Sequence, residues 1–145
     1  AYEILRCLVC SEMCIRDRFY SGDLCYMDEE GRIRINGRKK EVIIRGGENI
    51  SAREIDDDLI GAPGLANSAT IGMPDDRLGE RICTFVAPLG DTVPTLESVT
   101  AYLEGEGVPK RLWPERIEII EEIPKTLMGK VRRNVLTDEL AARMA

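Results

Sequence analysis

The stretch Arg81-Ile-Cys-Thr-Phe-Val-Ala87 decides the fold class. It is short and rich in β-branched and aromatic residues, which predicts a strand. Successive side chains of a strand point to opposite faces, and both alternating sets are largely apolar here. We therefore expect both faces of this strand to be covered, as in the sheet of a domain built from packed layers.

The flanking sequence alternates between strand and helix patterns, with glycine and proline marking the turns. The other strand patterns are Phe19–Tyr26, which begins as a loop, Arg32–Ile35, Glu41–Arg45, Leu65–Met73 and Arg116–Ile120. The turn patterns are Asp28–Gly31, which would make a hairpin, Asn36-Gly37, Gly46-Gly47 and Pro74–Asp76.

Three helices are expected. Ser51-Ala-Arg-Glu54 is a capping box that should start a helix running to about Ile60. Thr95 can cap a second helix, to about Glu104, and a third should cover residues 131 to about 144. Strands alternating with helices predict a small α/β or α+β domain, with a short β-sheet flanked by helices.

Composition excludes several functional classes. The chain has 145 residues, 43% of them hydrophobic, which suits one globular domain and not a disordered chain. Its net charge of -6 argues against nucleic-acid binding. No apolar run is long enough to span a membrane and no secretion signal is recognisable, so we expect a cytoplasmic protein.

Histidine is absent, which excludes Ser-His-Asp and Cys-His catalysis. Cys7, Cys10 and Cys14 crowd the N-terminus, but no histidine can supply the fourth ligand of a zinc site. The odd total of five cysteines argues against a disulfide framework. We expect free thiols and no metal site.

Three segments carry chemistry. Asp23 ends Phe-Tyr-Ser-Gly-Asp and suits a ribose-hydroxyl acceptor or a turn cap, and Gly46-Gly47 lets a ligand approach the backbone or simply turns the chain. Lys130 ends Pro-Lys-Thr-Leu-Met-Gly-Lys. That segment is no Walker loop, because Pro124 and Val131 replace the required glycine and Ser/Thr.

In this order, the segments resemble three motifs of adenylate-forming enzymes, the superfamily of acyl-CoA synthetases, firefly luciferase and peptide-synthetase adenylation domains. Phe19–Asp23 is similar to the motif Y-x-T-G-D, with Phe19 for Tyr and Ser21 for Thr. Gly37–Asp56 is similar to the hinge motif, and Pro124–Lys130 to P-K-T-x-x-G-K. The resemblance therefore implies the small C-terminal α+β domain of these enzymes, preceded by a hairpin of the large domain.

The resemblance also implies a division of the chain. Residues 19–36 would end the large AMP-binding domain, residues 37–40 would be the hinge, and residues 41–145 would form the C-terminal domain. Residues 1–18 do not follow the family pattern, and SEMCIRDR resembles translated sequencing-adapter sequence. We interpret residues 1–18 as an artefact and the chain as a gene fragment.

Residue roles follow by similarity. Asp23 and Arg38 match residues that bind the nucleotide. Lys130 matches the lysine that stabilises charge during adenylation. Lys40 matches the hinge residue about which the domain rotates.

The Gly46-Gly47 turn matches the loop that lines the pantetheine tunnel. The implied function is ATP-dependent activation of a fatty, alicyclic or aromatic acid to an acyl-adenylate, followed by transfer to coenzyme A. Mg²⁺ would be bound by the missing large domain, so this chain would be inactive alone. The alternatives are a domain that loads an aryl or amino acid onto a carrier protein, and a non-catalytic module.

Overall fold

The computed structural model describes residues 14–15, 18–19, 22–90 and 92–144. The strands are β1 (Cys14–Ile15), β2 (Arg18–Phe19), β3 (Asp23–Met27), β4 (Ile33–Arg38), β5 (Val42–Arg45), β6 (Glu48–Ser51), β7 (Leu65–Asp75), β8 (Gly79–Pro88) and β9 (Arg116–Ile119). The helices are α1 (Ala52–Asp58), α2 (Leu96–Gly105) and α3 (Arg133–Met144), with 3-10 turns η1 (Lys39–Glu41) and η2 (Lys110–Leu112).

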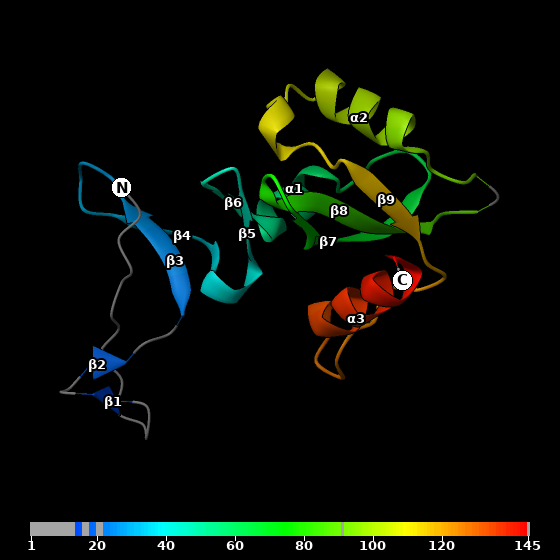
Figure 1. The fold of residues 1–145 in the computed structure, drawn as a ribbon. Coiled ribbons are helices and arrows are strands. Elements are labelled where there is room, and N and C mark those ends of the chain that lie inside the picture. The colour runs from blue at the N-terminus through cyan, green and yellow to red at the C-terminus, as the bar shows by residue number, and fades with distance from the viewer. Residues whose placement is uncertain (1–13, 16–17, 20–21, 91, 145) are drawn as a thin grey trace.

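A mixed five-stranded sheet forms the centre of the domain, with β8 as its central strand (Figure 1). The order is β6-β5-β8-β7, and β9 pairs with β8 in parallel, while the other pairs are antiparallel. β8 meets β5 at its start, through Gly79 and Arg45, and β9 further along, from Cys83 onward. The expected α+β fold with a sheet between helices is confirmed.

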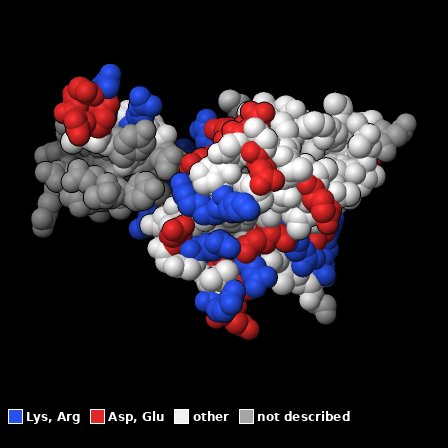
Figure 2. Space-filling model, turned by 90° about the horizontal axis from the view of Figure 1, so that it is seen from above, with Lys and Arg blue, Asp and Glu red and all other residues white. Residues whose placement is uncertain are grey.

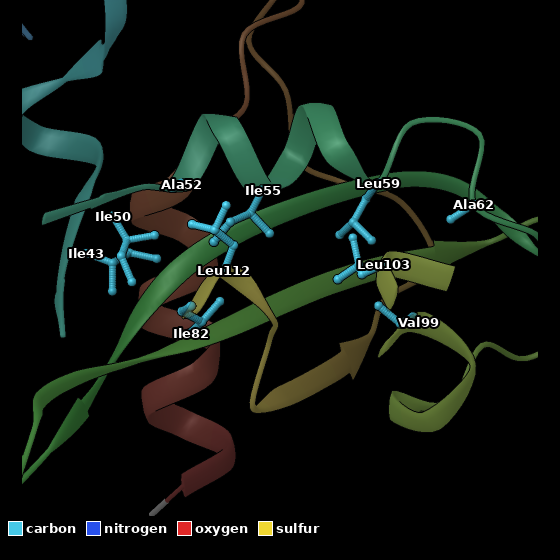
Figure 3. Packing of buried hydrophobic residues seen from close by; sticks show 10 residues of the cluster. All are labelled: Ile43, Ile50, Ala52, Ile55, Leu59, Ala62, Ile82, Val99, Leu103 and Leu112. Carbon is cyan, nitrogen blue, oxygen red and sulfur yellow. The ribbon is translucent and has the colours of Figure 1, made fainter. Parts of the chain in front are cut away.

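Both faces of β8 are buried, as its sequence predicts. Ile82 faces the cluster under α1 and α2, and Cys83 and Phe85 face the cluster under α3. The first cluster, drawn in Figure 3, is made of Ile43, Ile50, Ala52, Ile55, Leu59, Ala62, Ile82, Val99, Leu103 and Leu112. Leu136 and Leu140, one helical turn apart on α3, close the second cluster.

A separate hairpin, β3–β4, precedes the main sheet. Asp23 pairs with Arg38 at its open end, and a bulge at Asn36 shifts the register. Gly37 follows the bulge with a positive φ of 146°, and a Cβ there would lie 2.8 Å from the Ser51 hydroxyl oxygen. Only glycine therefore lets β4 come this close to the start of α1.

The structure corrects the sequence-based assignment at three points. Asn36-Gly37 lies inside β4 and is not a turn. Pro74 and Asp75 extend β7, and the turn follows them. Strand β6 was not expected, and it pairs with β5 across the two-residue Gly46-Gly47 turn.

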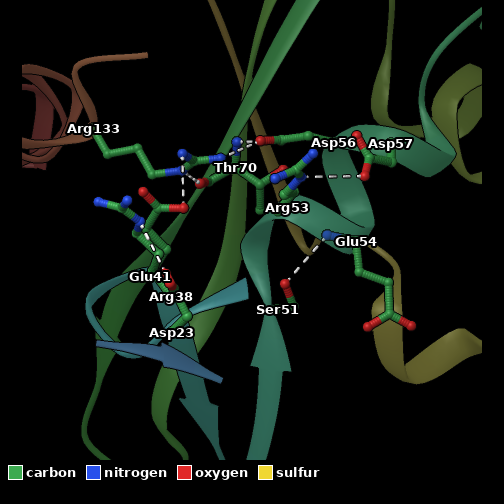
Figure 4. Close-up of polar contacts among 10 residues, drawn as sticks. All are labelled: Asp23, Arg38, Glu41, Ser51, Arg53, Glu54, Asp56, Asp57, Thr70 and Arg133. Atoms are coloured by element: carbon green, nitrogen blue, oxygen red, sulfur yellow. Dashed lines mark hydrogen bonds and ion pairs between the residues drawn. The ribbon is translucent and has the colours of Figure 1, made fainter. Parts of the chain in front are cut away.

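The N-cap of α1 is confirmed in part. Ser51 Oγ accepts a hydrogen bond from the Glu54 backbone N at 3.4 Å. The Glu54 side chain points away from Ser51 in Figure 4, so the second bond of a capping box is not formed. The full capping box instead occurs at Thr95 and Ser98, at the start of α2.

Candidate functional site

A cavity of about 820 Å³ opens between the β3–β4 hairpin, α1 and the loop before α3. Its lining includes Asp23, Arg38 and Lys130. These are three of the predicted site residues, and they come from two distant parts of the sequence. The fold thus brings the first and third chemical segments to one place.

Asp23 and Arg38 face each other because they pair at the open end of the hairpin. Arg38 Nε lies 3.3 Å from Asp23 Oδ1. Figure 4 draws this ion pair as a dashed line. The Lys39 backbone N also donates to the Gly22 carbonyl at 2.8 Å, which closes this end of the hairpin. A carboxylate acceptor and a guanidinium donor are therefore held side by side at the cavity, which suits recognition of hydroxyl groups and anions.

Lys130 ends a closed loop. The Thr126 backbone N donates to the Lys130 carbonyl at 2.8 Å, and the Lys130 backbone N donates to Thr126 Oγ1 at 3.2 Å. Gly129 turns the chain with a φ of 78°. The Lys130 ammonium makes no ion pair within the described part of the chain, so it is available to an anion in the cavity.

A buried charge network lies behind the cavity. Arg133, near the start of α3, contacts Asp56 of α1, and its Nη1 lies 3.4 Å from Glu41 Oε2 (Figure 4). Arg133 Nε donates to the Thr70 carbonyl at 3.0 Å, and the Thr70 backbone N donates to Asp56 Oδ1 at 2.7 Å. This network joins η1, α1, β7 and α3.

Burial raises the pKa of Asp56 to about 6, and it outweighs the opposing effects of Arg133 and the hydrogen bonds from Thr70. The carboxyl group is therefore mostly ionised at pH 7 and pairs with Arg133. Asp56 ends the hinge motif, but no pattern in the sequence assigns it this ion pair, and Arg133 lies outside all three motifs. The two residues are 77 positions apart, so no local sequence pattern links them.

The other predicted residues lie elsewhere. Lys40 is exposed in η1, between β4 and β5. Gly46 and Gly47, with φ of 59° and 87°, form the β5–β6 turn and do not line the cavity. Two positive φ values in a two-residue hairpin turn favour glycine at both positions.

The surface charge is mixed. On the face drawn in Figure 2, basic and acidic side chains are interspersed, without a continuous basic area. Cys25 and Cys83 are buried, and Cys83 is a free thiol, whereas Cys7 and Cys10 lie outside the described residues. Within residues 22–90 and 92–144, no cluster of candidate metal ligands occurs and no helix has the length and apolarity needed to cross a bilayer.

The family follows from comparison with known proteins. Residues 54–130, more than half of the chain, match the model of the AMP-binding enzyme C-terminal domain. The chain belongs to this family. The match includes Lys130 and most of the main sheet, and it starts inside α1.

Two curated relatives and one solved structure are similar over most of the chain. A medium-chain fatty-acid–CoA ligase of Escherichia coli is 44% identical over 129 residues, or 87% of the chain, and a 2,3-dihydroxybenzoate-AMP ligase of Bacillus subtilis is 35% identical over 88% of it. ATP-bound MatB of Rhodopseudomonas palustris matches with a TM-score of 0.73 and 32% identity, over 85% of this chain and 24% of that one. The chain spans only 22% and 24% of the two relatives' lengths.

Proposed function

We propose that this C-terminal domain is the mobile part of an AMP-forming acyl-CoA synthetase. The complete enzyme would activate a carboxylic acid with ATP and pass the acyl group from the adenylate to coenzyme A. Asp23, Arg38 and Lys130 line one cavity, and this observation carries the proposal. The similarity of the chain to a medium-chain fatty-acid–CoA ligase favours a fatty acid as the substrate.

In this proposal, the hairpin pair binds the nucleotide. The Asp23 carboxylate accepts hydrogen bonds from the ribose hydroxyl groups. Arg38 holds Asp23 in place from 3.3 Å and can donate to the nucleotide with its other nitrogens. Both residues act through binding, so they serve the steps in which a nucleotide is present.

Lys130 would act on the adenylation step. Negative charge increases at the α-phosphate and the acyl oxygens as the acid attacks, and an ammonium group placed there stabilises the transition state. The closed loop at Thr126 keeps the Lys130 backbone fixed, so little reorganisation accompanies the reaction.

The thioester step would use another surface of the same domain. We assign residues 37–40 as the hinge, with Lys40 in η1 as the residue that absorbs the rotation. After rotation, the Gly46-Gly47 turn would line the tunnel for the pantetheine thiol. Neither glycine lies at the cavity of Lys130, which supports two separate working surfaces.

The partner in this proposal is the large AMP-binding domain, to which residues 19–36 would belong. It would contribute the acyl pocket and the residues that bind Mg²⁺, whose charge neutralises the phosphates of ATP. Residues 41–145 would be the C-terminal domain. The buried free thiol of Cys83 agrees with the reducing environment of the cytoplasm, where we place the enzyme.

A chimera tests this function. Residues 19–145 would replace the matching segment of the E. coli relative, and acid-dependent ATP–pyrophosphate exchange and thioester formation would be measured. Lys130→Ala should reduce exchange by about 10²–10³. Thioester formation from supplied acyl-adenylate should be largely retained, because Lys130 has moved away in that step.

Lys110→Ala is the matched control. Lys110 is an exposed lysine that stacks 5.2 Å from the Trp113 ring centroid, and it does not line the cavity. This variant should keep normal exchange. Normal exchange in Lys130→Ala would remove Lys130 from its role, and thioester formed only on a carrier protein would favour the aryl-acid or amino-acid alternative.

A further inference from the structure

Three consecutive residues of the chain, Ile44, Arg45 and Gly46, are each held by a different group of the main sheet. They form the end of β5 and the first position of the Gly46-Gly47 turn. The β5–β6 hairpin lies at one end of the sheet, next to the β3–β4 hairpin (Figure 1). Only one backbone pair, Arg45 with Gly79, joins β5 to β8, so other contacts must fix this end of β5.

The first contact is a carboxylate that takes the place of a strand carbonyl. The Ile44 backbone N donates to Glu80 Oε2 at 2.6 Å. Glu80 reaches this position by lying over Gly72 of the neighbouring strand β7. A Cβ at Gly72 would lie 2.7 Å from Glu80 Oε1 and 2.8 Å from Glu80 Cδ, so this position must be glycine for the carboxylate to remain there.

The second contact is an ion pair that ties β5 to the start of β9. Arg45 Nη2 and Nε donate to the two carboxylate oxygens of Glu115 at 2.9 and 3.2 Å. The Ile82 backbone N donates to Glu115 Oε2 at 3.2 Å. The hydrogen bonds from Arg45 lower the pKa of Glu115, so the carboxylate remains ionised at neutral pH.

The third contact holds the turn itself. The Gly46 backbone N donates to the Leu78 carbonyl at 2.8 Å, at the turn between β7 and β8. Asp75 shapes that turn, because its carboxylate accepts from the Arg77 and Leu78 backbone N atoms at 3.0 and 2.8 Å. The Gly46-Gly47 turn is therefore held by a backbone hydrogen bond to the β7–β8 turn, which Asp75 fixes in turn. This anchor matters because the two glycines have no side chains that could hold the turn.

We propose that Gly72, Glu80 and Glu115 are positioning residues for the thioester step, because they fix the Gly46-Gly47 turn against the main sheet. The proposal rests on the proposed function of that turn as a wall of the thiol tunnel. None of the three residues lines the cavity that contains Lys130. Their loss should therefore slow thiol transfer and spare adenylation, the opposite of Lys130→Ala.

The test uses the same chimera and measures both half-reactions. Glu80→Ala should reduce thioester formation from supplied acyl-adenylate by about tenfold or more, since small displacements of a reacting site are costly. Pyrophosphate exchange should change little. Glu80→Gln should restore most of the loss, because its amide oxygen can still accept from the Ile44 backbone N.

Gly72→Ala and Glu115→Ala test the same contacts independently. Gly72 has an ordinary strand conformation, so alanine is compatible with the backbone and acts by displacing the flexible Glu80 carboxylate. Glu118→Gln is the control, because Glu118 forms comparable ion pairs with Arg116 and Arg143 away from β5. It should leave the ratio of the two half-reactions unchanged. Equal loss of both steps in the Glu80 and Gly72 variants, or no loss at all, would overturn the proposal.

Amide exchange of the 145-residue chain separates this proposal from the proposed function. The Ile44 amide should exchange faster in Glu80→Ala and in Gly72→Ala, while amides in the middle of β8 stay protected. Unchanged exchange at Ile44 in both variants would refute the contact whatever the chimera does. A chimera that forms no thioester without any substitution would instead contradict the proposed function.

Discussion

Replacing Arg133 with methionine removes the centre of the buried charge network and keeps most of the side-chain volume. The side chains of Arg133 and Asp56 are 19% and 15% exposed, so solvent screens them little. Removing one partner of a buried pair typically costs about 3–5 kcal/mol, because the other charge stays buried and unpaired. We expect the loss of stability in Arg133→Met to be smaller than this, because Asp56 can become neutral by taking up a proton.

The magnitude follows from the pKa of Asp56. With a pKa of about 6, protonating Asp56 at pH 7 costs only about 1.4 kcal/mol. The loss of the hydrogen bond to the Thr70 carbonyl and of the ion pair with Glu41 adds about 1 kcal/mol. The free energy of unfolding should therefore fall by about 2–3 kcal/mol, which lowers the urea midpoint by about 1–2 M.

The pH dependence of the free energy of unfolding is the sharpest test of the role of Asp56. Burial raises the folded-state pKa of Asp56 above its unfolded value, so its contribution to stability is largest below pH 4 and is lost as the pH rises to about 6. At pH 5, Asp56 is already mostly protonated in the unsubstituted chain. The difference in free energy of unfolding between Arg133→Met and the unsubstituted chain, called the deficit below, should then shrink to about 1 kcal/mol.

Urea unfolding at pH 5 and pH 7, followed by circular dichroism, measures this deficit. The control is Arg53→Met, which breaks an exposed pair with Asp57 on the same helix and should cost less than about 0.5 kcal/mol. A deficit that is equal at both pH values, or larger at pH 5, would refute the role assigned to Asp56.

Two further predictions concern Gly37 and Cys83. Gly37→Ala should lower the free energy of unfolding by about 2 kcal/mol, because its φ is positive and the new Cβ would displace the Ser51 cap. Urea unfolding measures the change. Gly105→Ala, in a helix with open space around it, should be neutral or stabilising, and an equal loss there would contradict the argument. Burial raises the pKa of Cys83 to about 12, so iodoacetamide should modify it only after denaturation, as mass mapping of its peptide would show. Rapid labelling of Cys83 in the folded chain would contradict its placement in the core.

Much of the fold could be predicted from the sequence because its signals are local. The alternation in β8, the cap at Thr95 and the Gly46-Gly47 turn each need only a few neighbouring residues. Strand β6 escaped prediction because it has only four residues and its first two are exposed and polar. Pro74 predicts a turn, yet it lies in β7, an edge strand where a missing backbone donor is tolerated.

In the candidate site too, the residues within local motifs could be predicted, whereas the contacts between distant residues could not. The motifs that contain Asp23, Arg38 and Lys130 are contiguous, so the sequence identified them. The contacts that hold the Gly46-Gly47 turn join residues far apart in the sequence: Ile44 and Glu80 are 36 residues apart, and Arg45 and Glu115 are 70 apart. Such pairs leave no periodic pattern, and only the pairing of β8 with β5 and with β9 brings them together.

The parallel pairing of β8 with β9 has a consequence for the order in which the chain assembles. Short turns join β5 to β6 and β7 to β8, so these two antiparallel pairs can form early in folding. β9 must wait until residues 89–115, including α2, have crossed the sheet, because a parallel pair needs a long connection. Until then, the open edge of β8 offers unpaired backbone groups to any neighbouring strand. Self-association during refolding is therefore expected to begin at this edge and to stop once β9 pairs with β8.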